Sequence, residues 1–418
     1  MLWIAGCLML ALPAPPDHRV TRYGAVPDDD RPDTQAIQAA IDACARDGGG
    51  TVRFPAGRFL SGGLTLKSGI RLVLEKDAVL QGTAHPLDYG QGQWGDALLR
   101  GENLVDVILE GPGTIDGTDC RNPKGEEGFR GPHAIHLVGC RKIAVRNLTL
   151  MRTGNYALLL RDCREAEFLK VTVRGGHDGI HAQACRGFRI ADGDFRTGDD
   201  CLAGCDNEDF EVTGCRFNSS CNAFRLGCRG LLVRGCAFRG PGEFQHQVSK
   251  RTNMLSAFVH FAPRDRNPRL PSDAWLVEDC TIDNVDFVYG YDFERGLWQT
   301  GQPAKRLRFR NVRAAAVASP IRVLGDAERQ FDLTLEGVTI ALRKDREHQE
   351  VLDLERFGAL TLKNVTLQNG GRNPVLRARE GNRVWLDRVI CIPPRPAPYV
   401  LERVESVRTD PALDPAER

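Results

Sequence analysis

The fold is decided by residues 140–238, where one pattern recurs five times. Its copies are CRKIAVRNLTL from residue 140, CREAEFLKVTV from 163, CRGFRIADGDF from 185, CDNEDFEVTGCRF from 205 and CRGLLVRGCAF from 228. A first apolar position falls at Ile143, Ala166, Phe188, Phe210 and Leu231. A second falls, with the same spacings of 23, 22, 22 and 21 residues, at Leu150, Val173, Phe195, Phe217 and Phe238. This self-similarity indicates a structural repeat of about 22 residues.

Apolar and polar residues alternate over short runs within each copy, which is the period of a β-strand and not of a helix. A unit of this length cannot bury its own apolar face, so it must stack on its neighbours. The leucine-rich repeat signature is absent from these copies. We therefore predict an all-β chain that forms a right-handed single-stranded parallel β-helix, a solenoid with rungs of about 22 residues.

Five cysteines open the copies, at Cys140, Cys163, Cys185, Cys205 and Cys228. Residues stacked in neighbouring parallel rungs seldom have the geometry of a disulfide. We expect a column of small buried thiols at one turn of the coil, in preference to disulfide bridges.

The segments on either side of the repeat fit the same architecture. Asp33 precedes a run typical of a capped helix, about residues 33–47, which ends at three glycines and would cover the open end of the solenoid. Residues 240–272, rich in Pro, Arg and Gln, are expected to form an insertion or the wall of a cleft. Residues 17–418 are then predicted to be one elongated domain.

The N-terminus and the overall charge concern location and partners. Residues 2–12 are apolar and are followed by Pro13, Ala14, Pro15 and Pro16, so residues 1–16 resemble a signal peptide and predict a secreted or periplasmic protein. No later run is apolar for the ~20 residues that span a membrane. With Lys+Arg 56 and Asp+Glu 55, the net charge of +1 gives no footprint for nucleic acid. A monomer is expected.

Acidic residues recur with the repeat. Counting five residues beyond the second apolar position gives Asn155, Asp178, Asp200 and Asn222. Equivalent positions in adjacent parallel rungs lie about 4.7–4.9 Å apart, so Asp178 and Asp200 should be stacked neighbours, with Asp199 beside them. Three carboxylates so close cannot all ionise easily, and one should keep its proton near neutral pH. A protonated carboxyl beside ionised carboxylates is what glycosidic-bond hydrolysis requires, because one group protonates the leaving oxygen and another activates water. A stack of Asn and Asp that only satisfies the backbone is the alternative.

Other polar candidates follow in the same strands. Three residues further along lie Leu158, His181, Ala203 and Arg225. Arg225 suits a sugar carboxylate, because its guanidinium is a fixed fork of donors, but it could equally pair with Asp200. His181, His177 and Asn222 complete the predicted substrate-binding set. No metal or cofactor is expected. Several aromatic residues could stack on sugars or simply pack in the core: Trp94, Trp275, Tyr289, Tyr291 and Trp298.

Four stretches of sequence resemble glycoside hydrolase family 28, the polygalacturonase group. They are residues 20–25 (VTRYGA), 33–41 (DTQAIQAAI), 48–82 (from GGGTVRF to VLQG) and 111–117 (GPGTIDG). Gly176-His177-Asp178 stands where the family has Asn-Thr-Asp, and Gly198-Asp199-Asp200 matches its Gly-Asp-Asp. The family's Gly-His-Gly is replaced by Cys221-Asn222-Ala223, and its Arg-Ile-Lys is absent.

This resemblance implies a right-handed β-helix and metal-free, inverting hydrolysis of a pectic or other uronate-containing polysaccharide. It further implies that Asp199 is the general acid and that Asp178 and Asp200 hold the attacking water. Two alternatives remain. One is a polysaccharide lyase of the same shape, with Arg225 as base and Ca²⁺ on the aspartates. The other is a glycan-binding β-helix without catalysis.

Overall fold

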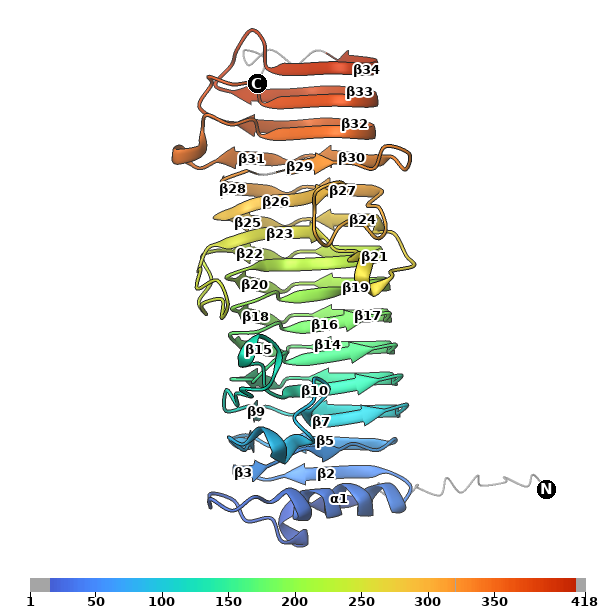
Figure 1. The fold of residues 1–418 in the computed structure, drawn as a ribbon, viewed down its shortest axis with the longest axis vertical. Coiled ribbons are helices and arrows are strands. Elements are labelled where there is room, and N and C mark those ends of the chain that lie inside the picture. Colours follow the sequence, from blue (N-terminus) through green and yellow to red (C-terminus); the bar gives the residue numbers. More distant parts are fainter. Residues whose placement is uncertain (1–15, 320, 411–418) are drawn as a thin grey trace, which may run out of the picture.

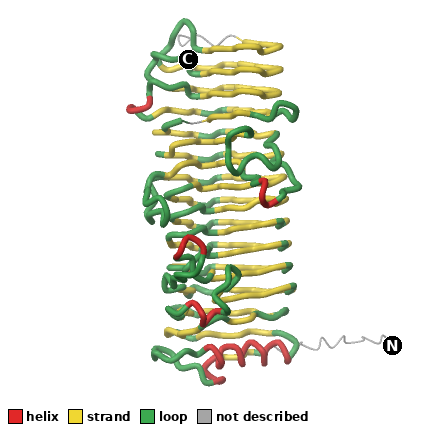
Figure 2. The backbone as a smooth tube through the Cα atoms, viewed as in Figure 1, coloured by secondary structure: helices red, strands yellow, loops and turns green. Residues whose placement is uncertain are grey.

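The structure, a computed structural model, describes residues 16–319 and 321–410. Figure 1 shows a tall stack of coils, with the helix at one end and the last strands at the other. Strands dominate every level of the stack (Figure 2), so the prediction of an all-β chain is confirmed. The predicted signal peptide, residues 1–16, lies outside the described residues except for Pro16. No helix within the described ranges is long and apolar enough to span a membrane.

Three columns of strands run the length of the stack, each pairing in parallel with the strand one coil further on. Column A holds β4 (Leu64–Thr65), β7 (Ala97–Glu102), β10 (His133–Val138), β13 (Leu158–Arg161), β16 (Ile180–Gln183), β23 (Met254–His260), β26 (Val285–Asp292) and β29 (Ile321–Leu324).

Column B holds β1 (Asp17–Arg19), β2 (Gly50–Phe54), β5 (Ile70–Leu74), β8 (Val105–Glu110), β11 (Arg141–Arg146), β14 (Arg164–Leu169), β17 (Arg186–Ala191), β24 (Asp273–Glu278), β27 (Arg306–Arg310) and β30 (Phe331–Glu336). Two long strands, β19 (Leu202–Thr213) and β21 (Asn222–Arg234), continue from column A into column B.

Column C holds β3 (Gly57–Ser61), β6 (Ala78–Gly82), β9 (Thr114–Asp116), β12 (Thr149–Met151), β15 (Thr172–Gly175), β18 (Asp194–Thr197), β20 (Arg216–Ser219), β22 (Ala237–Arg239), β25 (Thr281–Asp283), β28 (Arg313–Val317) and β31 (Thr339–Leu342). The last coils are the long strands β32 (Leu352–Gln368), β33 (Leu376–Ile392) and β34 (Tyr399–Asp410).

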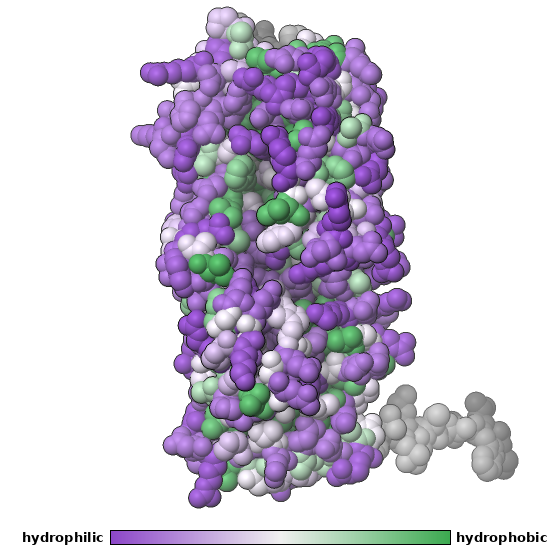
Figure 3. Space-filling view, viewed as in Figure 1, coloured by the Kyte–Doolittle hydropathy of each residue, from purple (hydrophilic) through white to green (hydrophobic). Residues whose placement is uncertain are grey.

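The register predicted by the two apolar positions is confirmed. In column B, Phe188 is aligned with Ala166 on one side and Phe210 on the other. In column C, Phe195 is aligned with Val173 and Phe217. These side chains point inward, where Phe188 and Phe210 stack with ring centroids 4.7 Å apart. The outer surface in the same view is mostly hydrophilic (Figure 3), so the core is the interior of the coils.

The cysteine column differs from its prediction at one position. Asn207, and not Cys205, is aligned with Cys228. The register shifts between Gly204 and Asn207, which absorbs the two extra residues of the fourth copy. Asn207 then makes two hydrogen bonds to the preceding coil, accepting from the amide of Cys185 and donating to the carbonyl of Ala182. The described cysteines are free thiols, nearly all of them buried.

The helix α1 (Thr34–Arg46) packs against β1 and β2 at the end of the stack, with Ile37 and Ile41 on its buried face. Asp33 precedes it, but its carboxylate does not cap the helix. It accepts instead from the amide of Val26, because the chain doubles back there.

Loops between columns leave the stack at few places. Residues 117–132 and 240–253 precede strands of column A, and residues 261–272 and 293–305 follow them. The predicted insertion of 240–272 is therefore two loops, because its residues 254–260 form the regular strand β23, aligned with β21. Short 3-10 turns lie in several of the connections: η1 (Val20–Tyr23), η2 (Pro86–Tyr89), η3 (Glu126–Gly128), η4 (Arg264–Arg266) and η5 (Lys344–Arg346).

Candidate active site

A cleft runs over the outer face of column A, between the loops that enter its strands and those that leave them. Two adjoining cavities, of about 600 and about 720 Å³, form it. They share four wall residues: Glu126, Arg130, Tyr156 and Arg266. Asp199, Asn222 and Arg225 line the first cavity, and His181 lines the second. Most of the predicted site residues therefore face one cleft.

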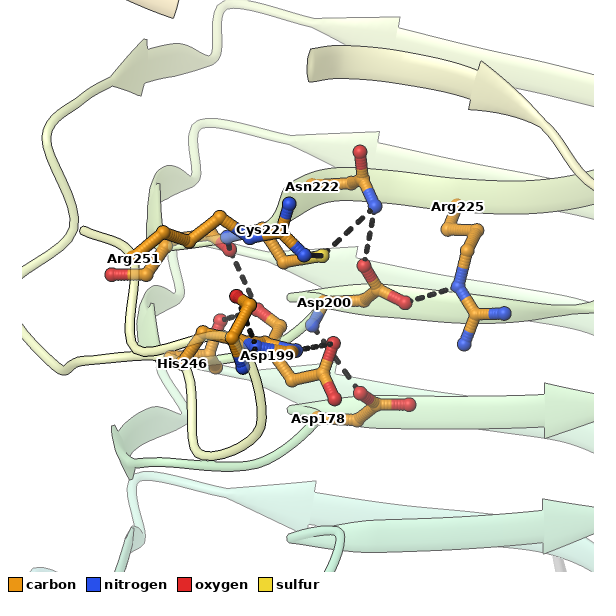
Figure 4. Close-up of polar contacts among 12 residues, drawn as sticks. Asp178, Asp199, Asp200, Cys221, Asn222, Arg225, His246 and Arg251 are labelled. Carbon is orange, nitrogen blue, oxygen red and sulfur yellow. Dashed lines mark hydrogen bonds and ion pairs between the residues drawn. The ribbon is translucent and has the colours of Figure 1, made fainter. Parts of the chain in front are cut away.

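The three aspartates converge where the strands of column A begin (Figure 4). Asp178 precedes β16 and Asp200 precedes β19, one coil further on. The amide of Asp200 donates to Oδ1 of Asp178 at 3.2 Å, so the two lie in adjacent coils. One carboxylate oxygen from each of Asp178, Asp199 and Asp200 lies within 4.8 Å of the corresponding oxygens of the other two.

Asp200 is fully buried but has polar partners. Its Oδ1 accepts from Asn222 Nδ2 at 2.8 Å, and its Oδ2 accepts from Arg225 Nε. Asn222 is fixed in turn by Ser256, whose hydroxyl donates to Asn222 Oδ1 at 2.7 Å. Neither carboxylate nor amide points into the apolar interior.

Arg225 is thus the partner of Asp200, the second of the two roles expected for it. Its guanidinium lies over the ring of Phe261 at 4.3 Å and over that of Trp298 at 5.4 Å. Burial opposes its charge, but the nearby carboxylates outweigh burial and raise the pKa of Arg225. Arg225 stays charged and is engaged within the site, with part of its side chain exposed to the cleft.

Asp178 is held by His181, which lies three residues further on, in β16. Nδ1 of His181 is 2.9 Å from Asp178 Oδ2, and Arg266 Nη1 is 3.1 Å from its Nε2. Because Arg266 can only donate, Nε2 accepts and Nδ1 carries the hydrogen that bonds Asp178. Burial and the charges of Arg225 and Arg266 lower the pKa of His181 well below its usual value. His181 is therefore a neutral residue that orients Asp178.

The strand register differs at one position from the predicted set of Leu158, His181, Ala203 and Arg225. Leu159, and not Leu158, is aligned with His181, Ala203 and Arg225. The spacing from Asn155 to Asp178 is 23 residues, but β13 and β16 are aligned at a spacing of 22, so Asn155 is displaced. Its Oδ1 accepts from Arg130 instead of stacking on Asp178.

Asp199 is the member of the trio exposed to the cleft, with 14% of its side chain accessible. Arg130 Nη2 donates to its Oδ2 at 3.4 Å, and His246 Nε2 lies 3.6 Å from its Oδ1. Burial would raise the pKa of Asp199, but His246, Arg225 and Arg130 outweigh it and lower the pKa below the ordinary value. Asp199 is ionised when the cleft is empty.

The other two carboxyls behave in the opposite way. Burial, with the charges of Asp199 and Asp200, raises the pKa of Asp178 well above its ordinary value. Burial also raises the pKa of Asp200, although Arg225 offsets part of the shift. These shifts favour a proton on the buried pair in the empty cleft, whereas the family resemblance implies a proton on Asp199.

His177 faces away from the cleft. It lines a separate pocket of about 280 Å³ together with Arg121, Phe129 and Gln247. Its ring stacks on Phe129 with centroids 5.8 Å apart, and burial lowers the pKa of His177 to about 3. His177 is a wall residue behind the aspartates, next to the cleft but outside it.

The aromatic candidates divide between core and cleft. Trp275, Tyr289 and Tyr291 are buried inside the coils. Trp298 is half exposed and lines the cleft beside Arg225, and Trp94 lines its other cavity. Two of the five therefore have faces that a sugar can reach.

Several site residues come from loops and were missed by the repeat. Arg130 comes from the loop 117–132, His246 and Arg251 from 240–253, and Arg266 from 261–272. Counting along coils cannot place such residues, because loops do not keep the repeat. Two signals were available in the sequence. The segment 240–272 is rich in basic residues, and its Lys250 and Arg251 are candidates, with Arg225, to replace the missing Arg-Ile-Lys of family 28.

Two groups have the spacing of metal ligands among the described residues: the aspartate trio, and Asp199 with Cys221 and His246. Arg225 and Arg130 already neutralise the trio. In the second group, the amide of Ser249 donates to His246 Nδ1 at 2.9 Å, which leaves the hydrogen on Nε2, the atom that faces Asp199. These donors favour a hydrogen-bonded site over a metal centre.

Carboxyl groups held close together are the catalytic groups that most glycoside hydrolases use, so the aspartate trio is of the kind found in that class of proteins. The sequence profile described as "Glycosyl hydrolases family 28" matches residues 44–220. That segment contains Asp178, Asp199 and Asp200 and ends before Arg225 and His246. Over residues 44–220 the chain is therefore similar to family 28.

Individual relatives that are similar to this chain are polygalacturonases, at low sequence identity. A probable polygalacturonase from Vitis vinifera is 31% identical over 208 residues, which are 43% of this chain and 42% of that protein. The matches span about half the length of the curated relatives.

Solved structures show the fold alone. A hyperthermoactive exopolygalacturonase from Thermotoga maritima superposes with a TM-score of 0.58 at 16% identity, covering 84% of this chain and 91% of that one. PfbA, a surface protein and adhesin of Streptococcus pneumoniae, superposes with a TM-score of 0.55 at 14% identity, covering 94% of this chain and 99% of that one. The fold is shared by an enzyme and an adhesin, so the function must be argued from the site.

Proposed function

We propose that this protein is a glycoside hydrolase that cleaves a pectic or another uronate-containing polysaccharide by inverting hydrolysis. The observation that carries the proposal is the convergence of Asp178, Asp199 and Asp200, with one oxygen of each within 4.8 Å of the others, Asp199 lining the cleft and the other two buried behind it. We further propose that residues 17–418 form one domain, a right-handed parallel β-helix. The protein is proposed to be a monomer that is secreted or periplasmic.

Acid catalysis is assigned to Asp199, the carboxyl that a glycan can touch. For this role Asp199 must receive a proton, and Asp178 is the group that holds one in the empty cleft. The trio titrates as a coupled set. We propose that a glycan entering the cleft displaces Arg130 from Asp199 and that the proton then passes from Asp178 to Asp199.

The same transfer prepares the water. Once Asp178 has given up its proton, Asp178 and Asp200 are both carboxylates and can accept a proton from a water between them and the anomeric carbon. Asp199–H protonates the leaving oxygen as the glycosidic bond breaks, and the water oxygen bonds the anomeric carbon. Because the water attacks the anomeric carbon directly, in a single displacement, the product has the inverted configuration.

Uronate recognition is supported by the charges of the cleft wall. Arg251 and Arg266 line the cavity beside Asp199, and neither has a carboxylate partner among the described residues. Arg225 is already engaged by Asp200. We assign the binding of a sugar carboxylate to Arg251 and Arg266, and sugar stacking to Trp298.

The test is turnover of a panel of pectic and other glycans by wild-type protein and by Asp199→Asn. We expect cleavage of a uronate-containing glycan by the wild type and a loss of at least about 10²-fold in kcat in the variant. Unchanged turnover in Asp199→Asn would reject the assignment. The anomer of the first product, followed by NMR, tests inversion. It is informative because oxygens within 4.8 Å are closer than the separation of about 6.5–9.5 Å usual for inverting pairs.

The two alternatives have weaker support. A lyase would need Arg225 as base, but its charge is stabilised by Asp200, which opposes loss of a proton. Products that absorb in the ultraviolet and activity lost in chelator would favour it. A binding protein without catalysis would hold the glycan unchanged after long incubation.

A further inference from the structure

The loop 240–253 brings a histidine to the trio from outside the repeat. His246 is buried, and its Nε2 lies 3.6 Å from Oδ1 of Asp199 (Figure 4). The segment matched by the family profile ends at residue 220, so Asp199 lies inside that segment and His246 lies beyond it. It is made to the one carboxylate of the trio that faces the cleft.

The direction of the contact is fixed by the loop itself. The backbone amide of Ser249 donates to His246 Nδ1 at 2.9 Å. An amide cannot accept, so Nδ1 must be the unprotonated nitrogen and a neutral ring carries its hydrogen on Nε2. The ring therefore presents an N–H to Asp199 and not a lone pair.

The loop holds the ring in place by backbone bonds at both ends. The amide of His246 donates to the carbonyl of Arg251, and the amide of Lys250 donates to the carbonyl of His246, each at 3.0 Å. Further along, the amide of Gly242 donates to the carbonyl of Thr252 at 2.7 Å. The imidazole thus sits on a closed turn, which limits its movement relative to Asp199.

We infer that His246 is a positioning residue, a hydrogen-bond donor supplied by the loop 240–253 that holds Oδ1 of Asp199 so that Oδ2 faces the glycan. The inference rests on the proposed function and adds to it a residue from outside the repeat. A separation of 3.6 Å is long for a hydrogen bond, and such contacts commonly shorten when the substrate is bound. Arg130 holds the other oxygen in the empty cleft.

The kinetic test compares His246→Ala with His246→Gln, whose side-chain amide can replace the Nε2–H donor. We expect kcat to fall about 10-fold or more in the alanine variant, with KM within about threefold, and to stay within about threefold of wild type in the glutamine variant. Equal losses in both variants would contradict the donor role. So would an unchanged kcat in His246→Ala.

A pH profile separates positioning from simple packing. The groups around Asp199 are Asp178, Asp200, Arg130, Arg225, Cys221 and His246. Removing a donor that lowers the pKa of Asp199 must raise that pKa, so the limb of the profile that reports Asp199 should move to higher pH in His246→Ala only. Gln247→Ala is the matched control, because Gln247 lies on the same loop and lines the separate pocket of His177. Its profile should match the wild type.

A readout without substrate keeps this inference distinct from the proposed function. Long-range ¹H–¹⁵N NMR of the wild type, assigned with His246→Ala, reports which ring nitrogen carries the hydrogen. We expect the Nε2–H form, with resonances that shift in Asp199→Asn. An Nδ1–H form would overturn the inference even if the enzyme cleaves glycans. The expected form in a protein that cleaves nothing would support the contact and reject the proposed function.

Discussion

Asp178 and Asp199 show how neighbouring residues of one kind acquire opposite electrostatics. Asp178 is buried beside two other carboxyls, and its pKa is raised, whereas Asp199 lies between Arg130 and His246, and its pKa is lowered. Environment sets the protonation state of each, as in other pairs of catalytic carboxyls. The contribution of the site to the free energy of unfolding therefore depends on pH.

Asp178→Asn should stabilise the protein at neutral pH while it abolishes turnover. Because folding raises the pKa of Asp178, its contribution to stability is greatest at low pH. That contribution is lost as the pH rises from the ordinary value of about 3.9 through the raised value of the folded state. Asparagine carries no charge and removes this cost. We expect a gain on the order of 1 kcal/mol, about 1–3 °C in Tm at pH 7, and a smaller gain at pH 4.

Asp199→Asn is the control of opposite sign for that measurement. The pKa of Asp199 is lowered by folding, so its charge stabilises the fold above the ordinary pKa and this stabilisation is lost as the pH falls. The asparagine variant should therefore lose stability at pH 7 and approach the wild type at low pH. A common trend in both variants would contradict the assigned charge states.

At this scale the sequence predicted part of the site. Asp178 and Asp200 could be placed together because both keep the repeat, and Asp199 adjoins Asp200. The partner of Asp200 was left open, since spacing alone cannot say whether Arg225 faces a carboxylate of the protein or of a sugar. Arg130 and His246 could not be predicted, because they reach the trio from loops of irregular length.

At the scale of elements, stability is concentrated in the aligned apolar rows. Phe210 is almost completely buried and stacks on Phe188 with ring planes 5° apart. Each such side chain contacts the rungs on both sides, so it joins three coils. The helix α1 closes one end of these rows, which would otherwise expose apolar side chains to water.

Phe210→Ala should destabilise the protein by about 3–5 kcal/mol, because a buried ring is replaced by a cavity between two coils. The midpoint of urea unfolding would report the change. Leu297→Ala is a suitable comparison, because Leu297 is 84% exposed on a loop and should leave that midpoint nearly unchanged. Similar effects of the two substitutions would show that the row does not carry the stability assigned to it.

The rows were predictable because every coil repeats the same two inward positions. The alignment of a column differs from the prediction where the number of residues in a coil changes. Asn207 replaces Cys205 in the cysteine column because two residues are inserted, and a side-chain amide then makes two hydrogen bonds that a thiol makes poorly. That substitution was visible in the sequence as an Asn 22 residues after Cys185.

Over the whole molecule, each coil pairs with the next through parallel strands. No described cysteine is part of a disulfide. Burial raises the pKa of several of these thiols, among them Cys201 and Cys205, which keeps them protonated and unreactive. The fold therefore rests on parallel pairing and packing along its length.

The Tm should accordingly be the same with and without dithiothreitol, within about 1 °C. Reductant cannot remove a cross-link that the described chain does not have, and buried thiols exchange slowly. Differential scanning calorimetry in both conditions is the measurement, with a disulfide-bonded protein such as lysozyme as the positive control. A lower Tm in reductant would mean that a disulfide supports the fold.

The loop 240–253 lies between two strands whose positions are set independently of it. Phe238 in β22 is aligned with Phe217, and Met254 in β23 is aligned with Val285. A segment anchored in this way can be exchanged for another of different length without moving the coils that hold the aspartates. Specificity can then be re-engineered, or diverge in evolution, by transplanting this one segment as a cassette, provided that the new segment still supplies the donor to Asp199 that His246 supplies here.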